Sequence, residues 1–125
     1  FVEVNFQKNQ IIFLHNLDSK FLVNLYKNSK FYIFSSYCEV FGFTSLEAMS
    51  QGCPVIISKR SALTEINSDA AQYFNPDDVI EIKDSMYRIL SEENYRSKII
   101  EKGRNHHKKF DWKKTVSSTL KILNY

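Results

Sequence analysis

The sequence predicts an α/β fold, a doubly wound and mostly parallel sheet with helices on both faces. Two observations predict it. Several short runs are apolar throughout, without alternating polar residues, as in strands that are buried on both faces. These runs alternate along the chain with longer segments whose apolar residues recur at helical spacing. With 125 residues, the chain is long enough for a single domain with one core.

Five segments have strand character. Residues 2–6 alternate apolar and polar side chains, so they are either a short strand or the tail of a preceding element. The other four are compact apolar runs that end at polar, Gly or Pro residues. These four predicted strands span 11–14, 31–35, 54–58 and 72–74.

Six segments have helical character. The first begins at Asp18 or Ser19 and the third after Ser61, residue types that cap helices. The second follows Gly42, and Gly52 stands just past its end, where glycine is typical. The predicted helices span about 19–28, 43–51, 62–66, 77–90, 92–110 and 112–123.

The composition argues against several classes of protein. A net charge of +3 is mild for a nucleic-acid-binding protein, so no nucleic-acid partner is expected. No apolar run approaches the ~20 residues that span a bilayer, and no leader-like segment is present. Cys38 and Cys53 lack the spacing of a disulfide framework or a zinc site, so a reducing, cytoplasmic location is expected. The chain begins at Phe1 without an initiator Met, so we expect a fragment of a longer protein.

The junction between the strand at 31–35 and the following helix has the features of a ligand site. The loop lies at the carboxyl end of a predicted strand, where open α/β sheets bind ligands. The helix start offers unpaired N–H groups and a partial positive charge, which suit phosphate. Glu39 and Glu47 flank this start, and their carboxylates can accept hydrogen bonds from sugar hydroxyls. The alternative for Glu47 is a capping box with Thr44.

The same segment resembles a known family. From Glu39 to Ile56 it has an acid, a turn with glycine, a second acid followed by Ala-Met, and Gly-x-Pro-Val leading into a strand. This order closely resembles the nucleotide-sugar-binding half of family 4 retaining glycosyltransferases, also called glycosyl transferases group 1. The likeness covers about residues 11–123, with further matches at 63–66, 69–71, 74–77 and 110–112.

The resemblance implies the donor-binding, C-terminal lobe of a GT-B enzyme, in which two Rossmann-like lobes enclose a cleft. Such an enzyme transfers a hexose-type sugar from a nucleotide-diphosphate sugar with retention of anomeric configuration. By resemblance, Glu39 is the catalytic residue whose carboxylate contacts donor-sugar hydroxyls, and Glu47 binds the ribose. The backbone groups for the sugar and diphosphate would come from Val40, Phe41, Gly42, Phe43 and Thr44, and the nucleobase turn from His15, Asn16 and Leu17.

The resemblance also implies the partners. The nucleotide-diphosphate sugar is a co-substrate, and no metal and no other cofactor is expected. A carbohydrate or lipid-linked acceptor would bind through an N-terminal lobe missing from this chain, so the isolated chain is expected to be inactive. A role in polysaccharide or glycolipid biosynthesis at the inner face of the membrane is implied. The basic stretch 102–114 is interpreted as a solvated helix face or as a peripheral contact with an anionic membrane.

Three features depart from the family pattern. Val40 and His15 stand where the family commonly has glycine. The basic pair that usually binds the diphosphate belongs to an earlier strand and is missing from this fragment. A non-catalytic doubly wound module that binds a nucleotide or another protein remains an alternative, as does an epimerase or phosphorylase of similar shape. With three glycines, no dinucleotide fingerprint or P-loop can be written.

Overall fold

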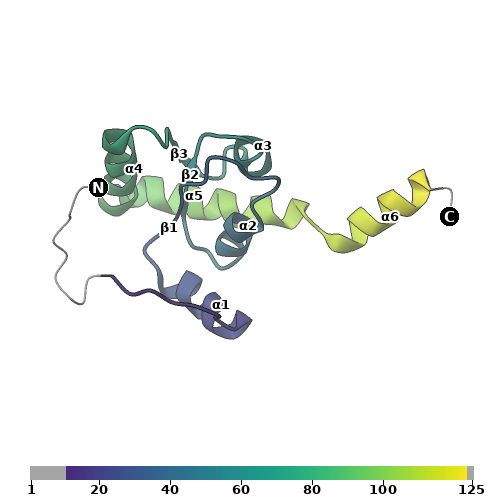
Figure 1. Cartoon of the computed structure of the whole chain (residues 1–125). Coiled ribbons are helices and arrows are strands. Elements are labelled where there is room, and N and C mark those ends of the chain that lie inside the picture. Colours follow the sequence, from purple (N-terminus) through teal and green to yellow (C-terminus); the bar gives the residue numbers. More distant parts are fainter. Residues whose placement is uncertain (1–10, 124–125) are drawn as a thin grey trace.

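The computed structural model describes residues 11–123 (Figure 1). The strand considered for residues 2–6 lies outside this range. Within it the chain forms three strands, six α-helices and one 3₁₀ helix. In chain order they are α1 (Ser19–Asn28), β1 (Tyr32–Phe34), α2 (Phe43–Ser50), β2 (Val55–Ser58), α3 (Leu63–Asn67), β3 (Gln72–Phe74), α4 (Val79–Ser91), α5 (Glu93–His106), η1 (His107–Lys109) and α6 (Trp112–Ile122).

The three strands form a parallel sheet in the order β1-β2-β3. Ile33 lies opposite Ile56, and Ile57 lies opposite Tyr73. All four residues of the central strand β2 are buried. A strand covered on both faces has no position at which a charged side chain could reach water, which explains its continuous apolar run before Ser58.

Helices cover both faces of the sheet. Val55 and Ile57 face one side, in a core cluster with residues of α1, α2 and α3. Ile56 faces the other side and packs in a second cluster with Ile89 of α4 and Ile99 of α5. The predicted fold class, a doubly wound parallel sheet with helices on both faces, is therefore confirmed.

The strand predicted at 11–14 is wrong. Residues Ile11 to Leu14 are extended coil without assigned secondary structure, and the Phe13 side chain is 81% exposed. An apolar run indicates that a segment is suited to burial, but a strand also needs a neighbour with which to pair. Among the described residues the outer edge of β1 has no partner strand, and the 11–14 segment does not supply one.

Three helices begin at the aspartates that the sequence places there. The side chains of Asp18, Asp78 and Asp111 accept first-turn N–H groups of α1, α4 and α6. The predicted Ser61 cap is wrong, because α3 begins after Ala62 without a side-chain cap. The helix predicted over 92–110 is shorter than expected, because α5 passes into η1 and the chain is extended at Phe110.

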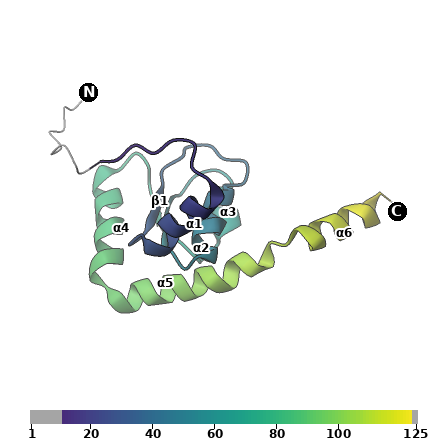
Figure 2. The same ribbon diagram turned by 90° about the horizontal axis from the view of Figure 1, so that it is seen from below.

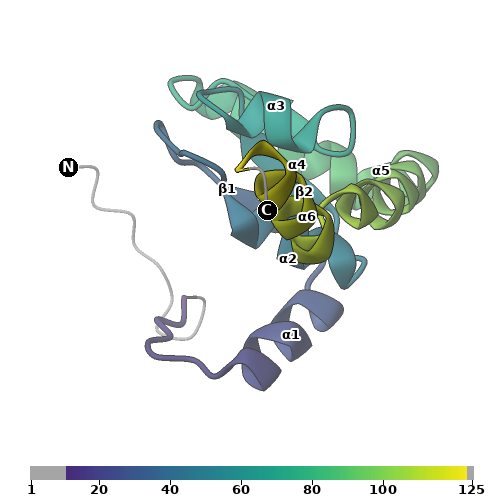
Figure 3. The same cartoon turned by 90° about the vertical axis from the view of Figure 1, so that its right-hand side faces the viewer.

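The last helix stands apart from the sheet. Figures 1 and 2 show α6 continuing beyond α5 and away from the strands, and Figure 3 views it nearly end-on. No residue of α6 is buried. Among residues 11–123, no helix combines the length and the apolar character that crossing a membrane requires.

Candidate donor-binding site

The carboxyl ends of the three strands lie at one edge of the sheet, because the strands are parallel and paired in register. The loops after β1, β2 and β3 therefore gather there. Ser58, the last residue of β2, donates a hydrogen bond to the Ser36 carbonyl after β1 at 2.6 Å. This contact fixes the start of the loop that carries the predicted site.

The start of α2 leaves its amide groups open. The N-cap is Gly42, which has no side chain and lies in the left-handed region at φ 80°. A Cβ at this position would lie 2.7 Å from Leu63 Cδ2, so both the backbone angle and the close packing require glycine. The Ser45 hydroxyl donates to the Gly42 carbonyl at 2.8 Å and does not cap the amides. Such a helix start can bind an anion through its free N–H groups.

The first amide groups of this helix have no competing acceptor. Among the described residues, no hydrogen bond joins the N–H groups of Phe41, Gly42, Phe43 or Thr44 to a protein oxygen. Val40, the remaining backbone position of the predicted site, has a 93% exposed side chain. Within residues 11–123, the amides of Phe41, Gly42, Phe43 and Thr44, which are predicted to hold a sugar diphosphate, therefore have no competing hydrogen-bond acceptor.

Glu39 is held by its backbone and free at its carboxylate. The Ser61 hydroxyl donates to the Glu39 carbonyl at 2.8 Å and lies 3.4 Å from the Glu39 amide nitrogen, which donates to it. Its side chain is half-buried. In the part of the chain that the structure describes, its carboxylate has no ion pair and no hydrogen bond. Glu39 is therefore fixed in position while its acidic group stays available.

Thr44 and Glu47 do not form the capping box. Thr44 lies inside the first turn of α2, and its hydroxyl oxygen accepts a hydrogen bond from Tyr32 Oη at 2.9 Å. Glu47 lies exposed one turn further along. The alternative role for Glu47 is thus contradicted by the position of the N-cap, which is Gly42.

Two tyrosines, Tyr32 and Tyr26, have raised pKa values. Burial raises the pKa of Tyr32, and the negative charges of Glu47 and Glu39 act in the same direction, against the hydrogen bond with Thr44. The pKa of Tyr26 is raised as well, chiefly by burial, with Tyr32 and Glu47 adding to it. The hydrogen bond with Thr44 ties Tyr32 to the first turn of α2.

A cavity of about 810 Å³ lies between α2 and the C-terminal segment. Phe41, Phe43 and Glu47 line one side, and Phe110 and Trp112 line the other. The Phe41 and Phe43 rings stack at 4.3 Å, and the Phe43 and Trp112 rings lie 6.3 Å apart and nearly parallel. Glu39 does not line this cavity.

The sequence prediction missed Phe110 and Trp112 as walls of a cavity beside Glu47. The signal was the aromatic pair around Asp111, which the sequence shows but which the site prediction did not include. Phe110 packs edge-on against Phe41, and Trp112 lies nearly parallel to Phe43, so the two segments together form an aromatic surface.

The segment predicted as the nucleobase turn is exposed. His15, Asn16 and Leu17 are exposed coil residues, and Asn16 has a φ of 51°. None of the hydrogen bonds, ion pairs or cavities found for residues 11–123 joins these three to the start of α2.

Residues 11–123 hold no group of three or more His, Cys, Asp or Glu side chains that could bind a metal ion. The absence of a metal cofactor stays a prediction.

These features define a class: a doubly wound α/β domain with an open helix start and two acidic side chains at the carboxyl edge of its sheet. The family then follows from comparison. The profile described as glycosyl transferases group 1 matches residues 4–106, and the chain belongs to this family. The family resemblance deduced from the sequence is therefore confirmed.

Sequence relatives agree with this assignment. The chain is 29% identical over 119 residues to O-antigen chain mannosyltransferase B of Escherichia coli, across 95% of this chain and 31% of that protein. It is 32% identical over 109 residues to the serotype-specific mannosyltransferase WbdA of Escherichia coli, across 87% of this chain and 13% of that protein. The chain thus spans a third or less of the length of these relatives.

The fold matches a solved structure. Sucrose-phosphate synthase from Thermosynechococcus elongatus superposes with a TM-score of 0.83 at 22% identity, over 94% of this chain and 30% of that one. This likeness confirms the predicted GT-B type of lobe as a fold.

Proposed function

We propose that this chain is the donor-binding lobe of a retaining glycosyltransferase that uses a nucleotide-diphosphate sugar. The observation that carries the proposal is the uncapped start of α2, flanked by the free carboxylate of Glu39 and the exposed carboxylate of Glu47. Family membership supports a sugar transferase. The open amides suit a diphosphate, and the acids suit hydroxyl groups.

The proposed roles follow from where charge develops. When the sugar leaves the nucleotide, negative charge grows on the diphosphate. Fixed N–H groups of Phe41, Gly42, Phe43 and Thr44 stabilise that charge without reorganising. The carboxylate of Glu39 would hold hydroxyls of the sugar and so fix the face that is attacked. The acceptor would enter on the face from which the nucleotide departs, which retains the configuration.

Glu47 would hold the nucleoside end of the donor. It points from α2 beside the cavity lined by Phe43 and Trp112, which offers aromatic faces next to the carboxylate. A carboxylate that accepts hydrogen bonds from two vicinal hydroxyls suits a ribose. His15, Asn16 and Leu17 stay in the proposal as the nucleobase turn.

The wider setting is also a proposal. The transferred hexose is first tested as mannose, because two of the relatives are named mannosyltransferases. We place the enzyme in the cytoplasm, at the inner face of the membrane, acting in polysaccharide or glycolipid synthesis without metal or further cofactor. The acceptor would bind to a second lobe outside this chain.

The basic stretch 102–114 contributes less to a membrane contact than its composition suggests. Lys102 pairs with Asp69 at 2.6 Å and is not free to bind lipid. Lys108, Lys109, Lys113 and Lys114 are exposed. We keep peripheral membrane contact through these four lysines as part of the proposal.

Calorimetric titration of the full-length protein with UDP-, GDP- and ADP-sugars tests the function. One donor should bind. Glu47→Ala should lower the affinity for this donor about 10-fold or more, since hydrogen bonds to a charged group contribute roughly 1.5–3 kcal/mol. Glu101→Ala, at an exposed position of α5, is the control and should leave affinity unchanged. Binding without sugar transfer to any glycan acceptor would favour the non-catalytic module, and no binding at millimolar donor would overturn the proposal.

A further inference from the structure

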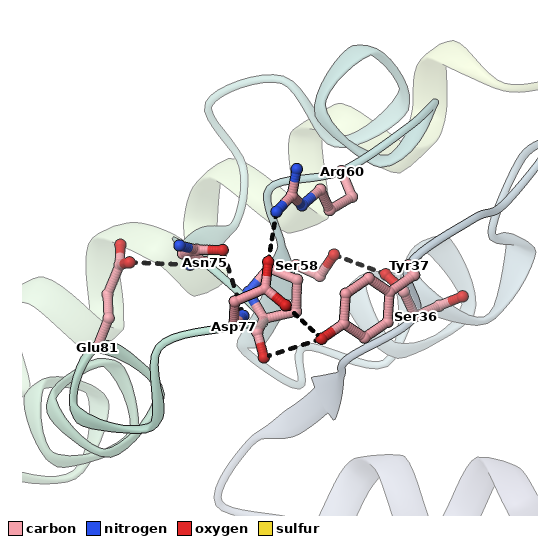
Figure 4. Close-up of polar contacts among 8 residues, drawn as sticks. Ser36, Tyr37, Ser58, Arg60, Asn75, Asp77 and Glu81 are labelled. Carbon is pink, nitrogen blue, oxygen red and sulfur yellow. Dashed lines mark hydrogen bonds and ion pairs between the residues drawn. The ribbon is translucent and has the colours of Figure 1, made fainter.

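The loops that follow the three strands are tied together by the carboxylate of Asp77 (Figure 4). One oxygen accepts a hydrogen bond from Tyr37 Oη at 2.6 Å, and the other lies 2.5 Å from Arg60 Nη2. Tyr37 follows β1, Arg60 follows β2 and Asp77 follows β3. A single side chain therefore joins all three loops at the carboxyl edge of the sheet.

These contacts continue to Glu39. Ser61 is the next residue after Arg60, and its hydroxyl bonds both the carbonyl and the amide of Glu39. Ser61 adopts a φ of 53°, a left-handed conformation that side chains with a Cβ rarely take without a compensating contact. Because Tyr37 lies two residues before Glu39, the contacts close a ring through Tyr37, Asp77, Arg60, Ser61 and Glu39.

Two more contacts brace this ring, and Figure 4 shows them beside it. Ser58 Oγ donates to the Ser36 carbonyl, immediately before Tyr37, at 2.6 Å. The Glu81 carboxylate accepts the Asn75 N–H at 2.9 Å, which ties the loop of Asp77 to the first turn of α4.

The ring is in its bonded form at neutral pH. The hydrogen bond from Tyr37 and the Arg60 guanidinium hold the pKa of Asp77 below its usual value. The same hydrogen bond raises the pKa of Tyr37. Asp77 is thus ionised and Tyr37 protonated, the states in which the carboxylate accepts from both partners.

We propose that Asp77, through Tyr37 and the Arg60–Ser61 segment, positions the Glu39 loop for the donor sugar. This inference rests on the proposed function and makes Asp77 a positioning residue, since it acts through Glu39. An ion pair at the surface contributes little to stability, and the Arg60 and Asp77 side chains are 47% and 52% exposed. The ring therefore acts on the placement of the loop more than on folding.

The location of the ring predicts which part of the donor is affected. Glu39 would hold the sugar, whereas the amides of α2 and Glu47 would hold the nucleoside diphosphate. Loosening the loop that carries Glu39 should therefore weaken the binding of the nucleotide sugar and leave the affinity for the free nucleoside diphosphate unchanged. A general loss of folding would weaken the binding of both ligands alike.

Tyr37→Phe and Asp77→Asn in the full-length protein test this inference. Tyr37→Phe keeps the aromatic side chain and removes its hydroxyl. Asp77→Asn keeps the shape of the side chain and removes its charge. Each should lower sugar-transfer kcat and the preference for nucleotide sugar over nucleoside diphosphate about 10-fold, well within the ~100-fold that misplacement can cost. Tyr87→Phe is the matched control, because Tyr87 is an exposed tyrosine of α4 whose hydroxyl forms no hydrogen bond within residues 11–123.

A second measurement separates positioning from an independent effect. On a Glu39→Gln background, Tyr37→Phe should produce no further loss of sugar preference, because the group that it positions is already impaired. An additive loss on that background would overturn the inference. Equal weakening of nucleoside diphosphate and nucleotide sugar by Tyr37→Phe would also overturn it.

The failures of the two proposals are distinguishable. If the wild-type protein binds no nucleotide sugar, the proposed function fails and this inference fails with it. If the wild type binds and Glu39→Gln removes the sugar preference, but Tyr37→Phe and Asp77→Asn behave as Tyr87→Phe does, only the inference fails.

Discussion

Gly103 of α5 lies directly against Met49 of α2: a Cβ added at Gly103 would be 3.0 Å from Met49 Cγ. Both residues are buried, and α2 and α5 pack closely at this point. The missing side chain at Gly103 lets α5 approach α2, and α2 in turn carries the open amides of the candidate site at its other end.

Gly103→Leu should therefore destabilise the domain. A larger side chain here has no space to occupy, and overpacking a core contact costs roughly 1–3 kcal/mol in the free energy of unfolding. Urea unfolding followed by circular dichroism measures the loss. Ser97→Leu, at an exposed position of the same helix, is the control and should change stability far less. Equal stability of the two variants would contradict the tight crossing of α2 and α5.

Gly52→Ala should destabilise the end of α2. Gly52 has a φ of 76°, and its Cβ would lie 2.5 Å from Arg104 Nη2. The left-handed conformation alone costs a residue with a Cβ about 1–2 kcal/mol. Arg104→Ala in the same chain should relieve the contact but not the backbone strain, so the double variant should recover only part of the loss in thermal unfolding. Full recovery would show that the backbone angle carries no cost.

Two neighbouring aspartates should separate stability from function. Asp78 caps α4, accepting from the Ile80 and Glu81 amides at 2.9 and 3.1 Å. Asp78→Ala should lower the free energy of unfolding by about 1 kcal/mol, the usual loss for a helix cap. Asp77→Ala removes no cap and should change stability less. Denaturant titration of both variants checks this. A larger loss of stability in Asp77→Ala than in Asp78→Ala would contradict the capping role of Asp78.

Stability should fall on the acid side through Asp69. The hydrogen bond and charge of Lys102 lower the pKa of Asp69. A depressed carboxyl pKa contributes stability above the pKa of the unfolded chain, which is lost as the pH falls through the folded value, from about pH 4 downwards. Lys102→Met should therefore flatten the decline in stability between pH 5 and about pH 3, measured by urea unfolding. Lys98→Met, an exposed lysine of α5, should leave the profile unchanged.

The two cysteines should react at different rates. Cys38 is exposed, whereas Cys53 is buried and burial raises its pKa to about 11. The thiolate is the reactive form, so a thiol reagent at pH 8 should modify Cys38 rapidly and Cys53 only after unfolding. Cys38→Ser should abolish the fast phase of the reaction. Fast labelling that survives in Cys38→Ser would mean that Cys53 is accessible.

Local patterns predicted the strands and helices that are completed within the chain. The strand at Gln72–Phe74 and the helix capped by Asp18 follow from neighbouring residues alone, and both lie where the sequence placed them. The segment Ile11 to Leu14 failed because strand formation depends on a partner edge, which no local pattern reveals. Ser61 failed for a related reason, since its hydroxyl bonds Glu39 across 22 residues instead of capping the adjacent helix.

The candidate site was predictable in part. The sequence order placed Glu39, Gly42 and Glu47 at a strand–loop–helix junction, and the structure has that junction with an uncapped helix start. Sequence reasoning could not supply the contacts between separate loops, because they depend on which strands are neighbours. The bonds from Tyr37 and Arg60 to Asp77 join residues 40 and 17 positions apart.

Both outer strands of the sheet, β1 and β3, have one neighbour each among the described residues. On β3 the Tyr73 carbonyl accepts hydrogen bonds from the side chains of Gln72 and Ser85. The outer edge of β1 has no partner strand among the described residues, and such an edge can recruit a strand from another molecule. A preparation of this chain alone is therefore prone to aggregate as its concentration rises. Keeping samples dilute will separate true ligand affinity from losses caused by precipitation.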